Sequence, residues 1–137
     1  LWIAKKYPKV AKQISIYERL SVPAFALAVL EEFILIGIVT ALALTLQWYS
    51  VWIAVFLGLS LHIFIHIGQW MMVRKYIPII ITSLLSLPYI FWGTHKIFSE
   101  FSLSMIITCF VIGTIVLIVN LRFVHKLALR YDKIRKK

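Results

Sequence analysis

The stretch FALAVLEEFILIG, residues 25–37, is apolar except for two adjacent carboxylates, Glu31 and Glu32. It lies inside a longer apolar run, residues 22–46. About 20 helical residues, each rising 1.5 Å, cross the hydrocarbon core of a bilayer, so this run is long enough to span a membrane. Three more runs of this kind follow, at residues 49–73, 77–94 and 101–121. The sequence therefore predicts an all-α, polytopic transmembrane helical bundle with four spans.

The composition supports a membrane protein and argues against other classes. Of the 137 residues, 62% are hydrophobic and 15% are charged, and the mean hydropathy is +0.94. The apolar runs lack the alternation of a membrane β-barrel. The formal net charge of +10 does not indicate nucleic-acid binding, because the basic residues stand at the ends of apolar runs rather than on one face of a soluble domain.

Lys and Arg are distributed unevenly between the two sides of the predicted bundle. Fourteen of the fifteen fall on one side, and Lys96 alone falls on the other. Because positive loops stay in the cytoplasm, both ends of this chain are predicted to be cytoplasmic. We divide the chain into a basic interfacial segment, a membrane domain and a basic cytoplasmic tail that continues the last helix and attracts anionic lipid, at residues 1–21, 22–122 and 123–137.

Two sets of ionisable residues lie at similar depth in neighbouring spans. Glu31 and Glu32 are roughly 14 Å from the cytoplasmic end of the first span, counted at 1.5 Å per residue. Counted back from Arg74 in the same way, His66 is at about 12 Å and His62 at about 18 Å. Ionisable residues in a span normally face the bundle interior or a water-filled cavity. We therefore expect the carboxylates and the imidazoles to share one layer.

The second span carries a polar stripe. His62 and His66 are four residues apart and Gln69 follows by three, which places all three on one helical face. The third span offers hydroxyl groups at a similar height, including Ser83. The sequence predicts a polar pocket in the cytoplasmic half of the bundle, with Gln69 and Ser83 as binding residues.

Three interpretations of these residues stay open. The first is a structural hydrogen-bonded network that fixes helix packing. The second is a metal site, with Glu32, His62 and His66 around Zn or Fe, which would make a hydrolase or isomerase acting on a lipid-like or small apolar substrate. The third is metal-free chemistry with Glu31, Glu32 and His66 as catalytic residues, or proton-coupled binding or transport. A non-catalytic subunit of a membrane complex is a further alternative.

Two stretches resemble a known family. AVLEEFILIG and LHIFIHIGQWMMVRKYIPIIITSLLSLPY are similar to the HXXEE family of bacterial integral membrane proteins, which is named for an intramembrane His-x-x-Glu-Glu motif and has no established biochemical function. The resemblance is strongest over residues 25–89 and implies the bacterial cytoplasmic membrane. His66, Arg74, Tyr76 and Pro78 match the second element of that family, whereas Ile79 stands where glycine is usual.

The motif that names the family is incomplete in this chain. If Glu31 and Glu32 are its two glutamates, Ala28 stands where histidine belongs. The chain begins with leucine and opens on LWIAKKYP, which looks like the exit from a preceding span. Either this chain is a variant in which Ala28 replaces the motif histidine, or the motif lies on an upstream helix. We favour the second, in a protein of five spans, and expect that helix or a membrane partner to complete the site.

Overall fold

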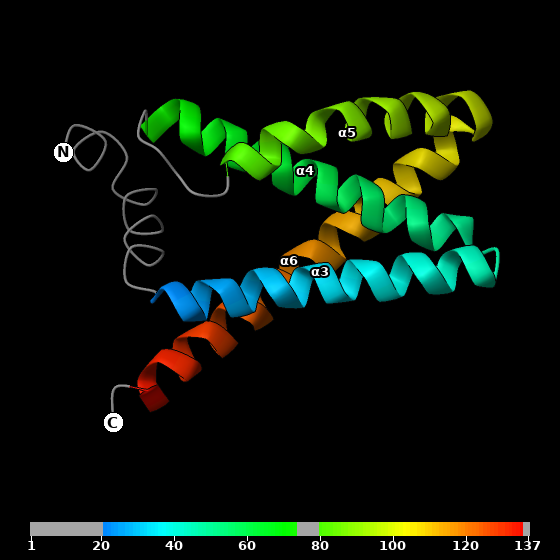
Figure 1. The fold of residues 1–137 in the computed structure, drawn as a ribbon. Coiled ribbons are helices and arrows are strands. Elements are labelled where there is room, and N and C mark those ends of the chain that lie inside the picture. Colours follow the sequence, from blue (N-terminus) through cyan, green and yellow to red (C-terminus); the bar gives the residue numbers. More distant parts are fainter. Residues whose placement is uncertain (1–20, 74–79, 136–137) are drawn as a thin grey trace. The chain divides into compact units, whose positions relative to one another are not determined.

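The structure is a computed structural model that describes residues 21–73 and 80–135 of the chain. This part contains four α helices and no strand (Figure 1), which confirms the predicted all-α fold. The helices are α3 (Val22–Thr45), α4 (Tyr49–Val73), α5 (Ile80–Glu100) and α6 (Leu103–Arg135). The predicted interfacial segment, residues 1–21, falls almost wholly outside the described residues. So do the matching positions Arg74, Tyr76 and Pro78 and the non-matching Ile79.

Three of the helices, α3, α4 and α6, are long and apolar enough to cross a membrane. The helix α5 does not meet this criterion, although the sequence predicted a span at residues 77–94. Its last turns carry Lys96 and Glu100, and Pro88 lies in its interior. Four helices are thus observed, and three of them have the composition of a span.

A tight turn joins α3 to α4. Gln47 has a positive φ of 57°, and the Trp48 N–H donates to the Ala43 carbonyl at 2.8 Å. This bond and the left-handed residue before it form a Schellman motif, which normally places glycine where Gln47 stands. The connection is short because the helix ends and reverses within three residues.

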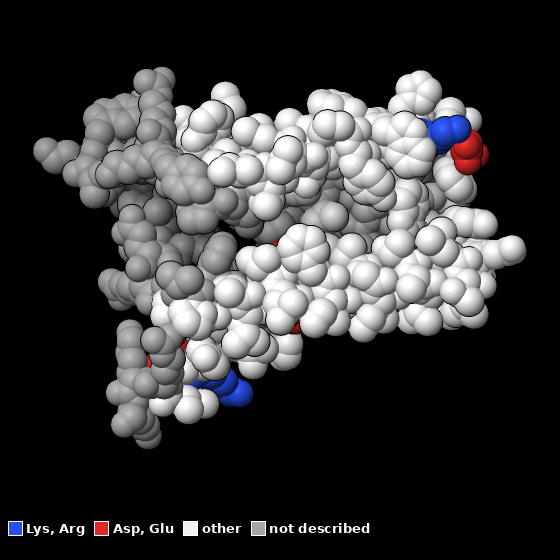
Figure 2. All heavy atoms as spheres, in the orientation of Figure 1, with Lys and Arg blue, Asp and Glu red and all other residues white. Residues whose placement is uncertain are grey.

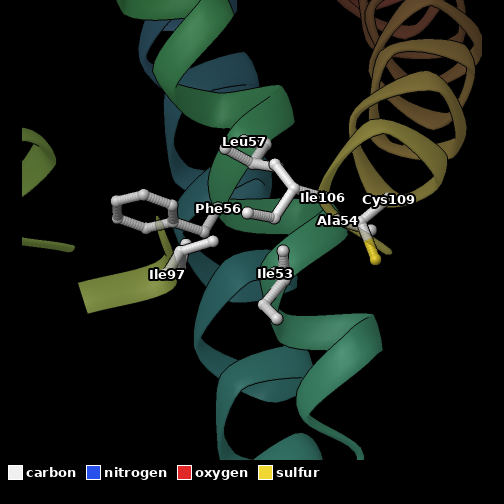
Figure 3. Close-up of a cluster of buried hydrophobic side chains, with 7 residues drawn as sticks. All are labelled: Ile53, Ala54, Phe56, Leu57, Ile97, Ile106 and Cys109. Carbon is white, nitrogen blue, oxygen red and sulfur yellow. The ribbon is translucent and has the colours of Figure 1, made fainter. Parts of the chain in front are cut away.

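The chain divides into two compact units, residues 1–35 with 121–137, and residues 36–120. The second unit holds the main apolar core, in which α4 supplies four of seven buried residues (Figure 3). These seven are Ile53, Ala54, Phe56, Leu57, Ile97, Ile106 and Cys109. The core therefore joins α4 to α5 and α6.

The helices α4 and α6 approach each other through small residues. A Cβ atom added at Gly58 would lie 2.8 Å from the carbonyl oxygen of Gly113, so the two backbones are in contact. The Cys109 thiol, one turn before Gly113, donates to the carbonyl of Ser50, two turns before Gly58, at 3.5 Å. Small residues permit this distance, and such contacts are common between membrane helices.

The helix α5 packs on α4 through an aromatic side chain and a glycine. The ring of Phe56 lies over Gly93, where an added Cβ atom would be 2.5 Å from the ring. Phe56 also meets Tyr89 edge to face, with ring centroids 5.6 Å apart, and stacks with Trp52 at 5.2 Å. This contact fixes the height of α5 against α4.

In the first unit, the start of α3 is bonded to the end of α6. Ser21 caps α3, because the Ala24 N–H donates to its Oγ at 3.4 Å. The Ser21 N–H donates to Asp132 Oδ2 at 2.8 Å, and the Ser21 hydroxyl donates to Asp132 Oδ1. Asp132 is buried, with 7% of its surface exposed.

The outer surfaces of the described helices are mainly apolar. Figure 2 shows that residues other than Lys, Arg, Asp and Glu cover most of the visible face. Large apolar side chains such as Phe33, Leu85 and Val119 are more than 60% exposed. Apolar surface this extensive is unusual for a protein in water and fits a protein surrounded by lipid.

Candidate functional site

A chain of hydrogen bonds joins three polar residues of α4. The Nε2 atoms of His62 and His66 are 2.9 Å apart, and His66 Nδ1 lies 3.2 Å from Gln69 Oε1. An amide oxygen only accepts, so His66 donates from Nδ1. When the His66 ring is neutral, its Nε2 atom carries a lone pair and accepts from His62 Nε2–H. We call these three hydrogen-bonded side chains the histidine relay.

The α4 sequence places this relay in line with the helix contact described above. Ser50, Ala54, Gly58, His62 and His66 follow one another at intervals of four residues. Such a row forms one continuous stripe along a helix. The stripe begins with the small residues that contact α6 and ends with the two imidazoles. His62 is buried, with 8% exposed, and His66 is half-buried.

Ser83 of α5 lies at the height of this relay. The helices α4 and α5 pack side by side (Figure 1), and Phe56 meets Gly93 between them. His66 is ten residues after Phe56, and Ser83 is ten residues before Gly93. In antiparallel helices both positions are about 15 Å from the contact. Ser83 is buried, with 2% exposed, and its place in the polar site stays a prediction.

The hydroxyl residues near Ser83 differ from it in burial and in hydrogen bonding. Ser86 Oγ donates to the Thr82 carbonyl of its own helix at 2.8 Å. Thr82 is exposed and Ser86 is half-buried. Of the hydroxyl residues that the sequence placed on this helix, Ser83 is therefore the buried one.

The two carboxylates of α3 are half-buried. Glu31 Oε2 is fully buried, and it has no hydrogen-bond partner among the residues that the structure describes. A buried polar atom without a partner costs about 1–3 kcal/mol and calls for an explanation. Glu31 and Glu32 belong to the first unit, whereas the histidines belong to the second. Their meeting in one layer stays a prediction.

The described residues do not by themselves form a metal site. Within residues 21–73 and 80–135, no group of three or more His, Cys, Asp or Glu residues could hold a metal ion. The two imidazoles supply two ligand atoms on one face. The predicted metal set of Glu32, His62 and His66 therefore stays a prediction.

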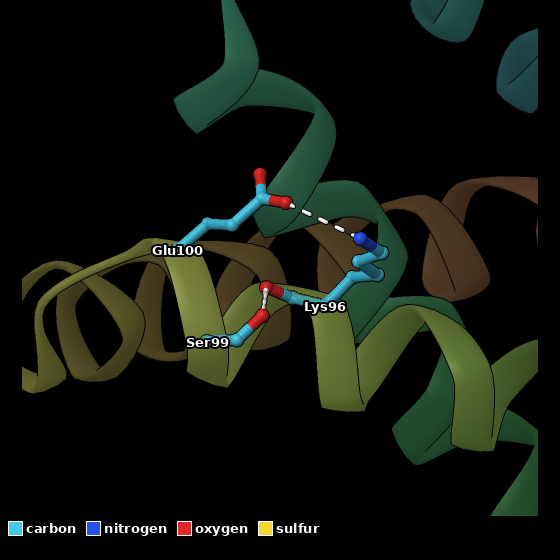
Figure 4. Close-up of polar contacts among 3 residues, drawn as sticks. All are labelled: Lys96, Ser99 and Glu100. Carbon is cyan, nitrogen blue, oxygen red and sulfur yellow. Dashed lines mark hydrogen bonds and ion pairs between the residues drawn. The ribbon is translucent and has the colours of Figure 1, made fainter.

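The charged residues at the end of α5 form a separate surface feature. Lys96 Nζ lies 3.6 Å from Glu100 Oε1, and both side chains are more than half exposed (Figure 4). The Ser99 hydroxyl donates to the Lys96 carbonyl at 2.9 Å in the same turn. Exposed pairs of this kind contribute little, about 0–1 kcal/mol. This group therefore does not resemble a site.

Sequence reasoning missed the role of Asp132. It was counted only as part of a basic tail, but it binds the start of α3. Two signals point to it in retrospect. The first turn of α3 has no acidic residue, although a helix N-terminus favours negative charge. Asp132 is also the only acid in residues 121–137.

These observations define an all-α protein that fits an integral membrane protein with polar side chains inside its apolar helices. A family model described as "Protein of unknown function with HXXEE motif" matches residues 1–93. The chain belongs to this family, as the resemblance predicted. Comparison with curated proteins and with solved structures gives no match.

Proposed function

We propose that this protein is a proton-coupled binding or transport protein of the membrane, with the His62–His66 pair as its proton-exchanging group. The observation that supports this function is the 2.9 Å distance between the two Nε2 atoms. Only one N–H can lie on the line between them, so the pair shares one proton. Imidazole is the side chain best suited to exchange protons near neutral pH.

The relay can move a proton by a simple sequence. A proton that binds His62 Nδ1 makes that ring an imidazolium. The proton on His62 Nε2 then passes to His66 Nε2: one N–H bond breaks, another forms, and the positive charge moves by one ring. His66 Nδ1–H already donates to Gln69 Oε1 at 3.2 Å. The proton that leaves the relay passes from His66 Nδ1 to a water molecule, because the amide oxygen of Gln69 accepts a hydrogen bond but is too weak a base to take the proton.

A positive charge inside apolar surroundings needs a counter-charge. Glu31 and Glu32 lie inside the apolar helix α3, and we assign them this role. The unpartnered Oε2 of Glu31 supports the assignment, because such an atom is suited to an incoming cation or donor. Gln69 and Ser83 then bind the polar group of the transported solute.

A metal site is the second candidate. Two imidazoles bound to one tetrahedral zinc at about 2.0–2.1 Å hold their nitrogens roughly 3.3 Å apart. The observed 2.9 Å between the Nε2 atoms is close to this value, so small ring rotations would admit a metal once the shared proton is lost. Gln69 would hold His66 from outside, as outer partners do in metal sites. Glu32 would supply the third ligand and the chemistry would be metal-assisted hydrolysis or isomerisation.

Proton flux tests the first candidate. The purified protein is placed in liposomes that contain a pH-sensitive dye, and a potassium diffusion potential drives protons across. We expect wild type to acidify the lumen, and His62→Ala and His66→Ala to reduce the rate at least about tenfold, as expected for loss of an acid/base group. His95→Ala is the matched control, because His95 is an exposed histidine of α5. Equal rates in wild type, empty liposomes and both variants would contradict a proton relay.

Metal content tests the second candidate with the same four proteins and with Glu32→Ala. Zinc or iron near one atom per chain that is retained in His95→Ala and lost in His62→Ala, His66→Ala and Glu32→Ala would favour the metal site. Protein that carries no metal and conducts protons supports the relay. Protein that does neither, and purifies with a second membrane protein, would favour the subunit alternative.

A further inference from the structure

The last turns of α6 carry a basic face. Four basic residues lie there at intervals of four, four and three, and at 100° per residue they fall within about 80° of the helix circumference. All four side chains are exposed, and none forms an ion pair within the described part of the chain. They are Arg122, Lys126, Arg130 and Lys133. Figure 2 shows blue residues over this end of α6.

The opposite side of the same turns is buried. Val124 and Ala128 are each 3% exposed, and Asp132 is 7% exposed. Both carboxylate oxygens of Asp132 accept hydrogen bonds from Ser21. This arrangement turns the only acid of residues 121–137 away from the basic face. The positive potential of that face is therefore not cancelled by its own helix.

A third face, next to the basic one, is apolar and exposed. Phe123 is 60% exposed, Leu127 42% and Ile134 75%. A basic stripe beside an exposed apolar stripe is typical of helices that lie at the boundary between lipid headgroups and acyl chains. The apolar side chains enter that boundary, and the basic side chains stay at the level of the phosphates.

The length of α6 places these turns at that boundary. The helix has 33 residues, or about 50 Å, whereas the hydrocarbon core is about 30 Å thick and takes roughly 20 residues. Counted from Leu103, the twentieth residue is Arg122, where the basic face begins. The remaining turns extend through the headgroup region and beyond.

We propose that residues 122–134 of α6 form a binding surface for anionic phospholipids. Phosphate oxygens accept hydrogen bonds from Arg122 and Arg130, and Lys126 and Lys133 add positive charge. Phe123 and its apolar neighbours insert beside the bound headgroups. A second copy of the chain does not suit this surface, because two such basic faces repel each other. This surface is independent of the histidine relay.

Lipid retention tests the proposal on the full chain. The protein is solubilised with an equimolar mixture of phosphatidylglycerol and phosphatidylethanolamine, and the lipids that stay bound are measured by native mass spectrometry. We expect enrichment of phosphatidylglycerol in wild type. A basic residue near a membrane surface is worth about 1 kcal/mol, so each change of these residues to Gln should lower the enrichment by up to about fivefold. Added salt should lower it as well.

Three comparisons keep the test specific. Lys96→Gln is the control for charge alone, since Lys96 is paired with Glu100 at the end of α5, and it should keep the enrichment of wild type. The double variant Arg122→Lys with Arg130→Lys preserves the charge and should keep most of the phosphatidylglycerol enrichment of wild type. Equal retention of both lipids by wild type, or unchanged enrichment in the variant with all four residues changed to Gln, would overturn the proposal. So would complete displacement by millimolar inorganic phosphate, which would indicate a phosphate site instead of a lipid surface.

Discussion

Gly113 of α6 lies directly against the backbone of Ala54 of α4. A Cβ atom added at Gly113 would be 2.0 Å from the Ala54 carbonyl oxygen and 3.3 Å from its Cα. These neighbours are backbone atoms, which cannot rotate away as a side chain does. The distance between α4 and α6 therefore depends on the absence of a side chain at this position.

Gly113→Ala is expected to destabilise the protein. The helices would have to separate by more than 1 Å, roughly the difference between 2.0 Å and an ordinary contact, and overpacking of this kind costs about 1–3 kcal/mol. A lower thermal midpoint in detergent would show it. Gly37→Ala is the matched control, because nothing lies within 4 Å of its added Cβ atom. Equal midpoints for the two variants would refute the close contact.

Asp132→Ala is expected to lower the free energy of unfolding, because it weakens the contact between the end of α6 and the start of α3. The change removes two hydrogen bonds to a carboxylate, each worth about 1.5–3 kcal/mol. Ser21→Ala removes one of them together with the helix cap. Because both changes affect the same contact, their effects on the free energy of unfolding should not add in the double variant. Additive effects would mean that the contact is absent in the protein.

Much of the fold could be predicted from the sequence because membrane helices are specified by length and apolar content. The starts of α3 and α4 were predicted at Val22 and Tyr49, and the structure begins both helices there. The third span was less predictable. It combines Pro88 with a charged end at Lys96 and Glu100, so α5 is not among the helices that are long and apolar enough to cross a membrane, although it is helical.

The candidate site was predictable only within a single helix. The spacing of His62, His66 and Gln69 fixes a common face, and the structure joins these three side chains. The Ser21–Asp132 contact was not predictable, because it joins residues 111 positions apart. Spacing along one helix carries no information on how distant helices pair. For the same reason, the meeting of Glu31 with the histidines stays a prediction.

Gln47→Gly is expected to stabilise the turn between α3 and α4. Gln47 adopts a positive φ of 57°, which costs a residue with a Cβ atom roughly 1 kcal/mol and costs glycine almost nothing. The thermal midpoint should therefore rise. Gln47→Val serves as the opposite control and should lower the midpoint, since β-branched residues tolerate this conformation least. A lower midpoint for the glycine variant would contradict the Schellman geometry.

The two histidines of the relay are expected to be in opposite tautomers. The acceptor Gln69 Oε1 fixes the proton of neutral His66 on Nδ1, and His66 Nε2 must then accept the proton that His62 carries on Nε2. Nitrogen-15 NMR of histidine-labelled protein in nanodiscs distinguishes these forms. Gln69→Leu removes the acceptor, so His66 should shift toward the Nε2–H tautomer while exposed His95 keeps its signals. Identical tautomers at His62 and His66 in wild type would rule out the direction of proton transfer proposed above.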